Sequence, residues 1–116
     1  EINKITKNMK KTINLAGKTN LTELACIIKS CDLFLTNDSG PMHIASCVKT
    51  PVVAIFGSTC PIQTGPTFES EVIKKDVKCA PCFKRECPKD LKCMNQISSR
   101  EVFEKIVKKL NWNKAW

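Results

Sequence analysis

The run Val52-Val53-Ala54-Ile55-Phe56 constrains the fold more than any other part of the chain. All of its side chains are apolar, so a strand formed here must be buried on both faces. Strands of this kind are typical of parallel sheets that carry helices on their two faces. The sequence therefore predicts an α/β fold in which 52–56 is a buried strand.

Weaker patterns on either side complete an alternation of strands and helices. Asn20 and Glu23 are spaced to cap one helix reciprocally, Ser98 and Glu101 are spaced to cap the last one, and Pro41 suits a first helical position. We expect further strands at 12–15, 33–36 and 72–77, helices at 21–31, 41–48 and 98–110, and a loop at 57–66. Such an order predicts a Rossmann-like parallel sheet with flanking helices.

The pattern fits one domain over residues 12–110, with a lead-in or helix tail at 1–11 and a tail at 111–116. The expected strands are fewer than a doubly wound domain usually has, and the first residue is Glu1 rather than Met. We therefore expect this chain to be part of a longer protein. It contains neither a long apolar run nor a signal-peptide pattern, and we expect a cytoplasmic location.

Basic residues are concentrated toward the C-terminus of a chain whose net charge is +8. Between Lys74 and Lys109 there are eleven Lys or Arg against five Asp or Glu. Such a surface can meet nucleic acid, an anionic membrane or a phosphorylated substrate, or can simply be solvated. There is no Tyr, and both Trp lie at the C-terminus, so nucleic acid is the weaker candidate.

Two loops fall at the carboxyl ends of expected strands, where open α/β sheets bind ligands: 37–43 (NDSGPMH) and 57–59 (GST). The first leads directly into a helix N-terminus, which favours phosphate. Gly40 allows close approach of a ligand, Ser39 adds a hydroxyl donor, and Asp38 can accept hydrogen bonds from sugar hydroxyls.

The same residues fit a purely structural role equally well. Asp38 or Ser39 would then cap the helix, Gly40 and Pro41 would make the turn, and His43 would be a half-buried imidazole. The pattern alone leaves both interpretations open.

Longer motifs resemble one family. NDSGPMH, a following short helix, TPVVAIFGST and a TGP turn are similar to the C-terminal domain of ADP-heptose:lipopolysaccharide heptosyltransferases. The run CAPCFKRECP with a later KCM resembles the heptosyltransferase II branch of that family. The resemblance extends from about Asn14 to Leu110, although Ser58 and Cys60 stand where Pro and Asp are common.

The resemblance implies a GT-B glycosyltransferase, in which two Rossmann-like domains face a cleft. Its reaction is inverting transfer of heptose from ADP-heptose to the lipopolysaccharide inner core, at the cytoplasmic face of the inner membrane and without a cofactor. The other domain binds the acceptor and supplies the catalytic carboxylate, so this chain alone is expected to be inactive. The implied donor-binding residues are Asp38, Ser39, Gly40, Pro41, His43, Gly57, Ser58 and Thr59, with Gly17 and Lys18 on the nucleotide side.

The cysteines form two groups. Cys26, Cys31 and Cys47 fall within apolar helical patterns and are expected to be small buried side chains. The segment 79–94, called the cysteine segment below, contains Cys79, Cys82, Cys87 and Cys93 and is expected to be irregular. These four can hold a structural zinc ion, form two disulfides or remain free thiols.

Two other functions stay open on the sequence. One is a basic zinc-binding module that docks to nucleic acid or to a protein, and the other is a GT-B transferase for a different nucleotide sugar. For the preferred heptosyltransferase reading, the expected partners are ADP-heptose, the lipopolysaccharide core acceptor through the rest of the enzyme, and an anionic membrane surface.

Overall fold

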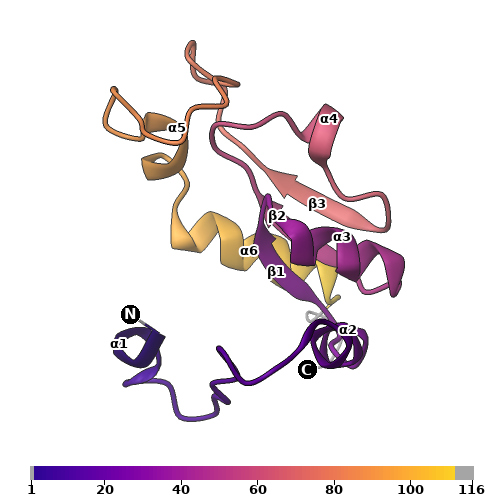
Figure 1. The fold of residues 1–116 in the computed structure, drawn as a ribbon. Coiled ribbons are helices and arrows are strands. Elements are labelled where there is room, and N and C mark those ends of the chain that lie inside the picture. Colours follow the sequence, from indigo (N-terminus) through magenta and orange to yellow (C-terminus); the bar gives the residue numbers. More distant parts are fainter. Residues whose placement is uncertain (1, 112–116) are drawn as a thin grey trace.

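The computed structural model describes residues 2–111, which form a three-stranded parallel sheet with helices on both faces (Figure 1). The strands are β1 (Phe34–Asn37), β2 (Val52–Ile55) and β3 (Ser70–Ile73), and β2 lies in the middle. Phe34 pairs with Val52, which in turn pairs with Ser70. The predicted fold class, a Rossmann-like parallel sheet with flanking helices, is confirmed.

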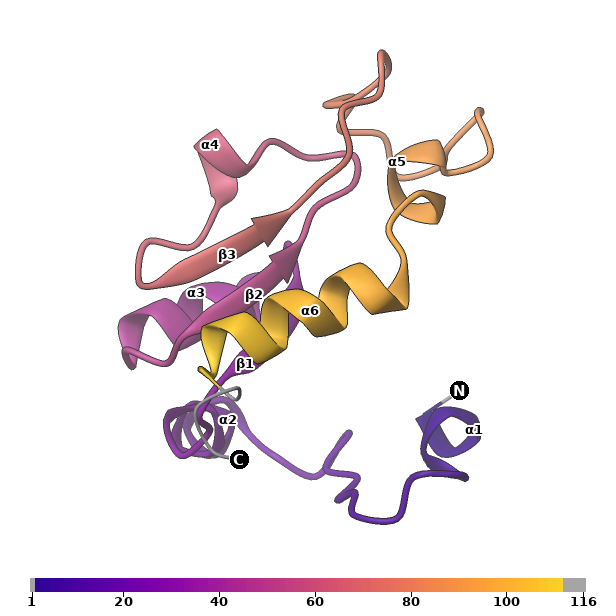
Figure 2. The same cartoon turned by 180° about the vertical axis from the view of Figure 1, so that it is seen from behind.

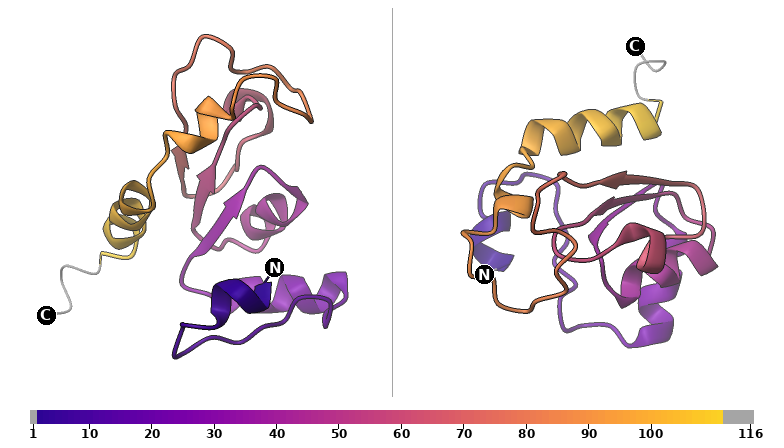
Figure 3. Two further views of the ribbon diagram at one scale, coloured as in Figure 1. Left: turned by 90° about the vertical axis from the view of Figure 1, so that its left-hand side faces the viewer. Right: turned by 90° about the horizontal axis from the view of Figure 1, so that it is seen from above.

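The helices divide between the two faces of the sheet. They are α1 (Ile2–Thr6), α2 (Leu21–Lys29), α3 (Gly40–Cys47), α4 (Pro61–Thr64), α5 (Lys92–Asn95) and α6 (Ser99–Lys109). Seen from behind and from above, α6 covers one face, and α3 with its neighbour α2 covers the other (Figures 2 and 3). The crossover helix α3 therefore joins β1 to β2 on a single face, as in a βαβ unit.

The sheet's core lies mainly between β2 and the α2–α3 layer. Side chains alternate along a strand, so Val52 and Ala54 face α3 and Val53 faces α6. All three are completely buried. The residues packed together on the α3 side are Ile28, Met42, Ala45, Val52, Ala54 and Phe56. Continuous burial of β2 explains its unbroken apolar sequence.

Ion pairs attach α6 to the other face. Lys105 Nζ lies 2.9 Å from Glu71 Oε2, and Lys75 Nζ lies 2.7 Å from Glu101 Oε2. The hydrogen bond from Lys105, with the positive charges of Lys105, Lys108 and Lys109, holds the pKa of Glu71 below its ordinary value despite partial burial. This side of the sheet is thus held by charge as well as by apolar contact.

One predicted cap is complete and the other is half formed. The Asn20 N–H donates to Glu23 Oε2 at 2.8 Å, and the Glu23 N–H donates to Asn20 Oδ1 at 2.9 Å. At α6 the Glu101 N–H donates to Ser98 Oγ at 3.1 Å. The Glu101 carboxylate does not return this bond because it pairs with Lys75.

The predicted strand at 12–15 is wrong. These residues belong to no strand, and Ile13 is 84% exposed. A strand needs a hydrogen-bonded neighbour, and within residues 2–111 none lies beside this segment. The strand expected at 72–77 begins earlier, at Ser70, where its pairing with β2 begins. Short helices α4 and α5 also appear where a loop and an irregular segment were expected.

The expectation that Cys26, Cys31 and Cys47 are buried is also wrong, because all three are exposed. Helix α2 buries Ile28, and α3 buries Met42 and its neighbours on the same face, which leaves Cys26 and Cys47 on the outer sides of these helices. Cys31 lies beyond the end of α2. Small apolar residues at helical spacing therefore did not mark the buried face.

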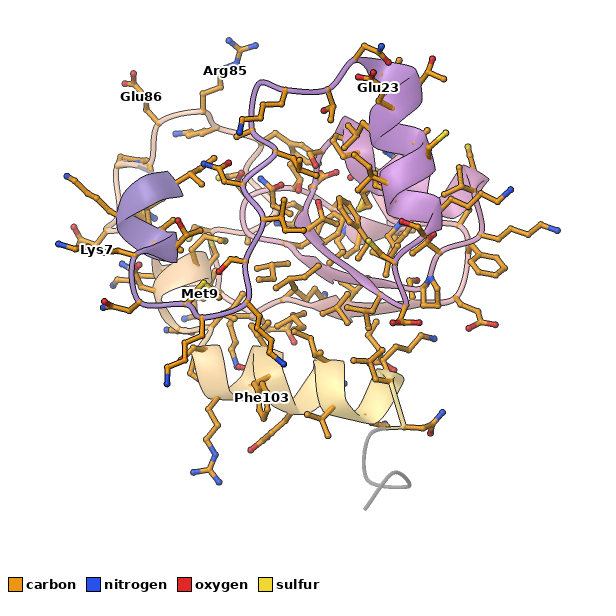
Figure 4. The ribbon with its side chains drawn as sticks, turned by 90° about the horizontal axis from the view of Figure 1, so that it is seen from below. Lys7, Met9, Glu23, Arg85, Glu86 and Phe103 are labelled. Carbon is orange, nitrogen blue, oxygen red and sulfur yellow. The ribbon has the colours of Figure 1, made fainter. Side chains whose placement is uncertain are left out.

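An apolar groove runs between the free edge of β1 and α6. Leu35 of β1 is 46% exposed and Phe103 of α6 is 59% exposed, and Met9 of the N-terminal segment also lines this groove (Figure 4). Of the two expected flanking regions, 1–11 contains α1, and 111–116 lies outside the described residues except for Asn111. Within 2–111, no helix combines the length and apolar character needed to cross a membrane.

Candidate functional site

Two strand-end loops meet at one cavity of about 220 Å³. Because β1 and β2 are parallel neighbours, their carboxyl ends lie at the same edge of the sheet. Asn37 ends β1 and Asp38 follows it, and Gly57, Ser58 and Thr59 come after β2. The structure thus brings together four of the predicted donor-binding residues, Asp38 and 57–59.

Asp38 is half-buried and held by a neighbouring element. Its Oδ2 atom accepts a hydrogen bond of 2.9 Å from the Thr64 hydroxyl, at the end of α4. This bond leaves the other carboxylate oxygen, Oδ1, available for a ligand. Thr64 was not predicted as a site residue, although it begins the TGP motif.

Ser39 precedes α3 without capping it through its side chain. Its Oγ atom lies 3.2 Å from Thr36 Oγ1 and donates to the Asn37 carbonyl oxygen at 3.3 Å. The structural interpretation in which the Ser39 hydroxyl closes the helix is therefore not supported. Pro41 has no N–H, and the Met42 N–H donates to the Ser39 carbonyl oxygen at 3.1 Å, so in this turn the Gly40 N–H is the group that keeps its capacity to bind an acceptor.

The first turn of α3 is open to solvent. Gly40 is exposed, and a Cβ atom built there would meet nothing within 4 Å. Pro41 is half-buried in the first turn, and His43 is exposed rather than half-buried. None of these three lines the cavity, although they follow Asp38 closely in the sequence.

The cysteine segment forms the opposite wall of the cavity. The N–H groups of Cys82 and Phe83 both donate to the Ser58 carbonyl oxygen, at 2.9 and 2.8 Å. A Cβ atom on Gly57 would lie 2.6 Å from Met94 Sδ, so the segment packs directly against the end of β2. A Cβ atom at residue 57 can therefore be accommodated only if the Met94 side chain moves.

Cys79, Cys82, Cys87 and Cys93 all line this cavity, and all are free thiols. In the part of the chain that the structure describes, no three His, Cys, Asp or Glu side chains are grouped to hold a metal ion. The arrangement supports neither the zinc site nor the disulfide pairs considered from the sequence.

The structure does not bring Gly17 and Lys18 to this cavity. Both are exposed in a turn closed by a hydrogen bond of 3.0 Å from the Lys18 N–H to the Leu15 carbonyl oxygen. In Figure 1 this part of the chain lies at the end of the sheet opposite the cysteine segment. Gly17 is used for its positive φ of 72°.

Three basic residues that were not predicted as site residues also line the cavity: Lys84, Arg85 and Lys92. The local excess of positive charge was visible in the sequence. Its position was not, because the cysteine segment has no periodic pattern that would place it against β1 and β2.

A family model described as Glycosyltransferase family 9 (heptosyltransferase) matches residues 1–93. The chain belongs to this family. Lipooligosaccharide heptosyltransferase 2 of Campylobacter jejuni subsp. jejuni serotype O:6 is 44% identical over 101 residues, which are 84% of this chain and 32% of that protein. Lipopolysaccharide heptosyltransferase 2 of Escherichia coli K12 is 43% identical over 62 residues, 53% of this chain and 18% of that protein.

A solved structure agrees with these relatives. The structure described as E. coli ADP-heptose lps heptosyltransferase II superposes with a TM-score of 0.68 at 29% identity, over 87% of this chain and 28% of that chain. The chain spans about a third of the length of the Campylobacter relatives. Membership of this family favours a glycosyltransferase over the zinc-binding module.

Proposed function

We propose that this chain forms the donor-binding part of an inverting heptosyltransferase, which transfers heptose from ADP-heptose to the lipopolysaccharide inner core. The observation that carries the proposal is the meeting of Asp38 with Gly57, Ser58 and Thr59 at the carboxyl edge of a parallel sheet, in a family 9 chain. By analogy with its relatives, the donor of this chain is a nucleoside diphosphate sugar and the acceptor is a lipid-linked saccharide.

In this proposal each feature of the site has a chemical task. The carboxylate of Asp38 accepts hydrogen bonds from sugar or ribose hydroxyls, while the N-terminus of α3 faces the phosphates. As the sugar leaves, negative charge grows on the diphosphate, and the helix dipole and nearby cations stabilise it. A base that deprotonates the acceptor hydroxyl belongs to the remainder of the enzyme. The chain alone therefore binds donor without turning it over.

An NMR titration of the chain with ADP tests donor binding. We expect the amide signals of Ser39, Gly40 and Gly57 to shift at millimolar ADP, because Gly57 lines the cavity and Ser39 and Gly40 directly follow Asp38, which also lines it. Shifts confined to residues 12–20 would contradict the proposed site.

Substitution in an enzyme that includes this chain tests the role of the carboxylate. Asp38→Ala should lower kcat/KM for heptose transfer at least about tenfold, or about 1.4 kcal/mol of transition-state stabilisation. Asp32→Ala, at an exposed carboxylate after α2, is the matched control and should leave transfer unchanged. Normal transfer by Asp38→Ala with reduced thermal stability would show that Asp38 is structural.

The proposal also places the enzyme at the cytoplasmic face of the inner membrane. Lys84, Arg85 and Lys89 are exposed on one projecting loop, and each basic residue near an anionic surface contributes about 1 kcal/mol. Charge reversal of these three should reduce sedimentation with anionic liposomes at low salt more than reversal of Lys4, Lys7 and Lys10. Equal binding to neutral liposomes would contradict membrane docking by charge.

Zinc has no task in the proposed reaction. The four thiols of the cysteine segment are assigned to the wall of the cavity, since no grouping of metal ligands occurs among the described residues. Stoichiometric zinc in the purified chain, with loss of fold on chelation, would contradict this assignment.

A further inference from the structure

Three cations of the cysteine segment have no acidic partner among the described residues, unlike three lysines beside α6 and β3. Lys75, Lys105 and Lys109 each form an ion pair beside α6 or β3. Within residues 2–111, none of Lys84, Arg85 and Lys92 does so, although all three line the cavity. Their charge is therefore available to a ligand.

The cavity itself carries an excess of positive charge. Asp38 is the single Asp or Glu among its lining residues, and one of its oxygens is taken by Thr64. Glu86 and Asp90 belong to the same segment but do not line the cavity. Three cations against one carboxylate in a concave site focus a positive potential that attracts anions.

The backbone next to Lys84 and Lys92 is anchored by contacts of the neighbouring residues. Lys84 directly follows Phe83, whose N–H is bonded to Ser58, and Lys92 directly precedes the buried Cys93. Arg85 lies farther out, and its guanidinium extends away from the loop (Figure 4). The backbone at Lys84 and Lys92 is thus anchored beside the cavity, which removes part of the ordering cost of binding, while both side chains are exposed and Arg85 stands at the rim.

The size of the cavity limits what it can hold. Sites for drug-sized ligands measure about 300–1,000 Å³, whereas this cavity measures about 220 Å³. A whole nucleotide sugar does not fit, but a diphosphate group does, with its substituents outside. Lys and Arg are the side chains best suited to phosphate oxygens.

We propose that Lys84 and Lys92, with Arg85 at the rim, form a diphosphate-binding subsite that faces Asp38 and the end of β2. This proposal rests on the proposed donor-binding function and assigns the phosphates to the cysteine segment rather than to α3 alone. It gives the segment a direct role in binding, and the four cysteines the task of shaping its wall.

Binding of ADP and of inorganic pyrophosphate to the whole chain, measured by calorimetry, tests the subsite. Lys84→Gln and Lys92→Gln should each weaken both ligands about three- to fivefold, the range for one partly exposed charge pair. Arg85→Gln should have a smaller effect because its guanidinium points outward. Lys78→Gln removes an exposed cation that does not line the cavity and should change neither affinity.

The outcomes separate the subsite from the donor function. Weaker ADP and pyrophosphate binding in both variants, with unchanged far-UV circular dichroism, supports the subsite. ADP binding that is unaffected by Lys84→Gln and Lys92→Gln overturns the subsite and leaves the donor function standing. Pyrophosphate binding that the variants weaken, without any ADP binding, supports an anion subsite and contradicts the donor function. Binding of neither ligand contradicts both.

Discussion

The β1–α3–β2 unit and the cysteine segment border the same cavity but are ordered by different means. In the first, Met42, Ala45 and Val52 are fully buried, and the hydrogen bonds of a helix and a sheet satisfy the backbone. In the second, Cys93 is the one buried residue of segment 79–94, and two hydrogen bonds to Ser58 replace a ladder. The comparison suggests a rigid scaffold that carries a separately attached wall.

Removing the largest buried side chain should destabilise both regions together. Phe56 is 1% exposed at the end of β2, and Phe56→Ala should lower the free energy of unfolding by about 3–5 kcal/mol. Phe103→Ala, at a ring that is 59% exposed, is the matched control and should cost about 1 kcal/mol or less. Urea denaturation monitored by circular dichroism measures both. Similar losses would show that the α6 groove contributes as much to stability as the core.

The scaffold was largely predictable because its causes are local. The apolar run at 52–56 and the Asn20–Glu23 pair each predicted an element that the structure contains within one or two residues. The strand at 12–15 failed because a strand depends on a partner that the pattern of four residues does not reveal. The predicted burial of Cys26 and Cys47 failed for a related reason, since the packing of α2 on α3 decides which side of each helix is buried.

The cysteine segment was hardly predictable. Hydrogen bonds from Cys82 and Phe83 to a carbonyl group about 25 residues earlier leave no trace in hydrophobic periodicity. The spacing of its thiols suggested a metal site, whereas the structure uses Cys93 as a small apolar side chain against Gly57. The residue types alone did not distinguish a metal-binding cysteine from one that serves as a small apolar side chain.

Replacing the buried Cys93 by a polar residue should detach the cysteine segment and leave the β1–α3–β2 unit folded. Cys93→Ser places a hydroxyl in a site that is 7% exposed, which costs about 1–3 kcal/mol when the group finds no partner. We expect faster trypsin cleavage after Lys84 and Arg85, with little change in the circular dichroism of the sheet. The control variant Cys87→Ser, at an exposed position, should be cleaved by trypsin at the same rate as the unchanged chain. Global unfolding by Cys93→Ser would mean that wall and scaffold form one cooperative unit.

Adding a methyl group at Gly57 tests the packing between the end of β2 and the cysteine segment. In Gly57→Ala the new methyl group would lie 2.6 Å from Met94 Sδ, so Met94 must move. Because Met94 is 38% exposed and flexible, we expect a loss of about 1 kcal/mol, at the low end for overpacking. Adding Met94→Ala should restore most of it, which a double-mutant cycle in urea measures. No recovery would locate the strain in the backbone at Gly57.

The smallest expected effect on stability concerns the ion pair of Lys105 with Glu71, in contrast to Lys84 of the cysteine segment, which is unpaired within residues 2–111. The pKa of Glu71 is lowered in the folded chain, chiefly by the hydrogen bond from Lys105, so the ionised form is favoured by folding. The resulting stability is present above the ordinary pKa of a glutamate and is lost as the pH falls through the lowered value. Because both side chains are about a third exposed, solvent reduces the gain to about 1 kcal/mol or less. Glu71→Gln should therefore lower the melting temperature slightly at pH 7 and by less as the pH falls toward the lowered pKa. Lys84→Gln, which breaks no ion pair, should leave the melting temperature of the free chain unchanged over the same pH range. An equal loss in the two variants would mean that Lys84 also has an acidic partner in solution, and the distinction between paired and free cations would then fail.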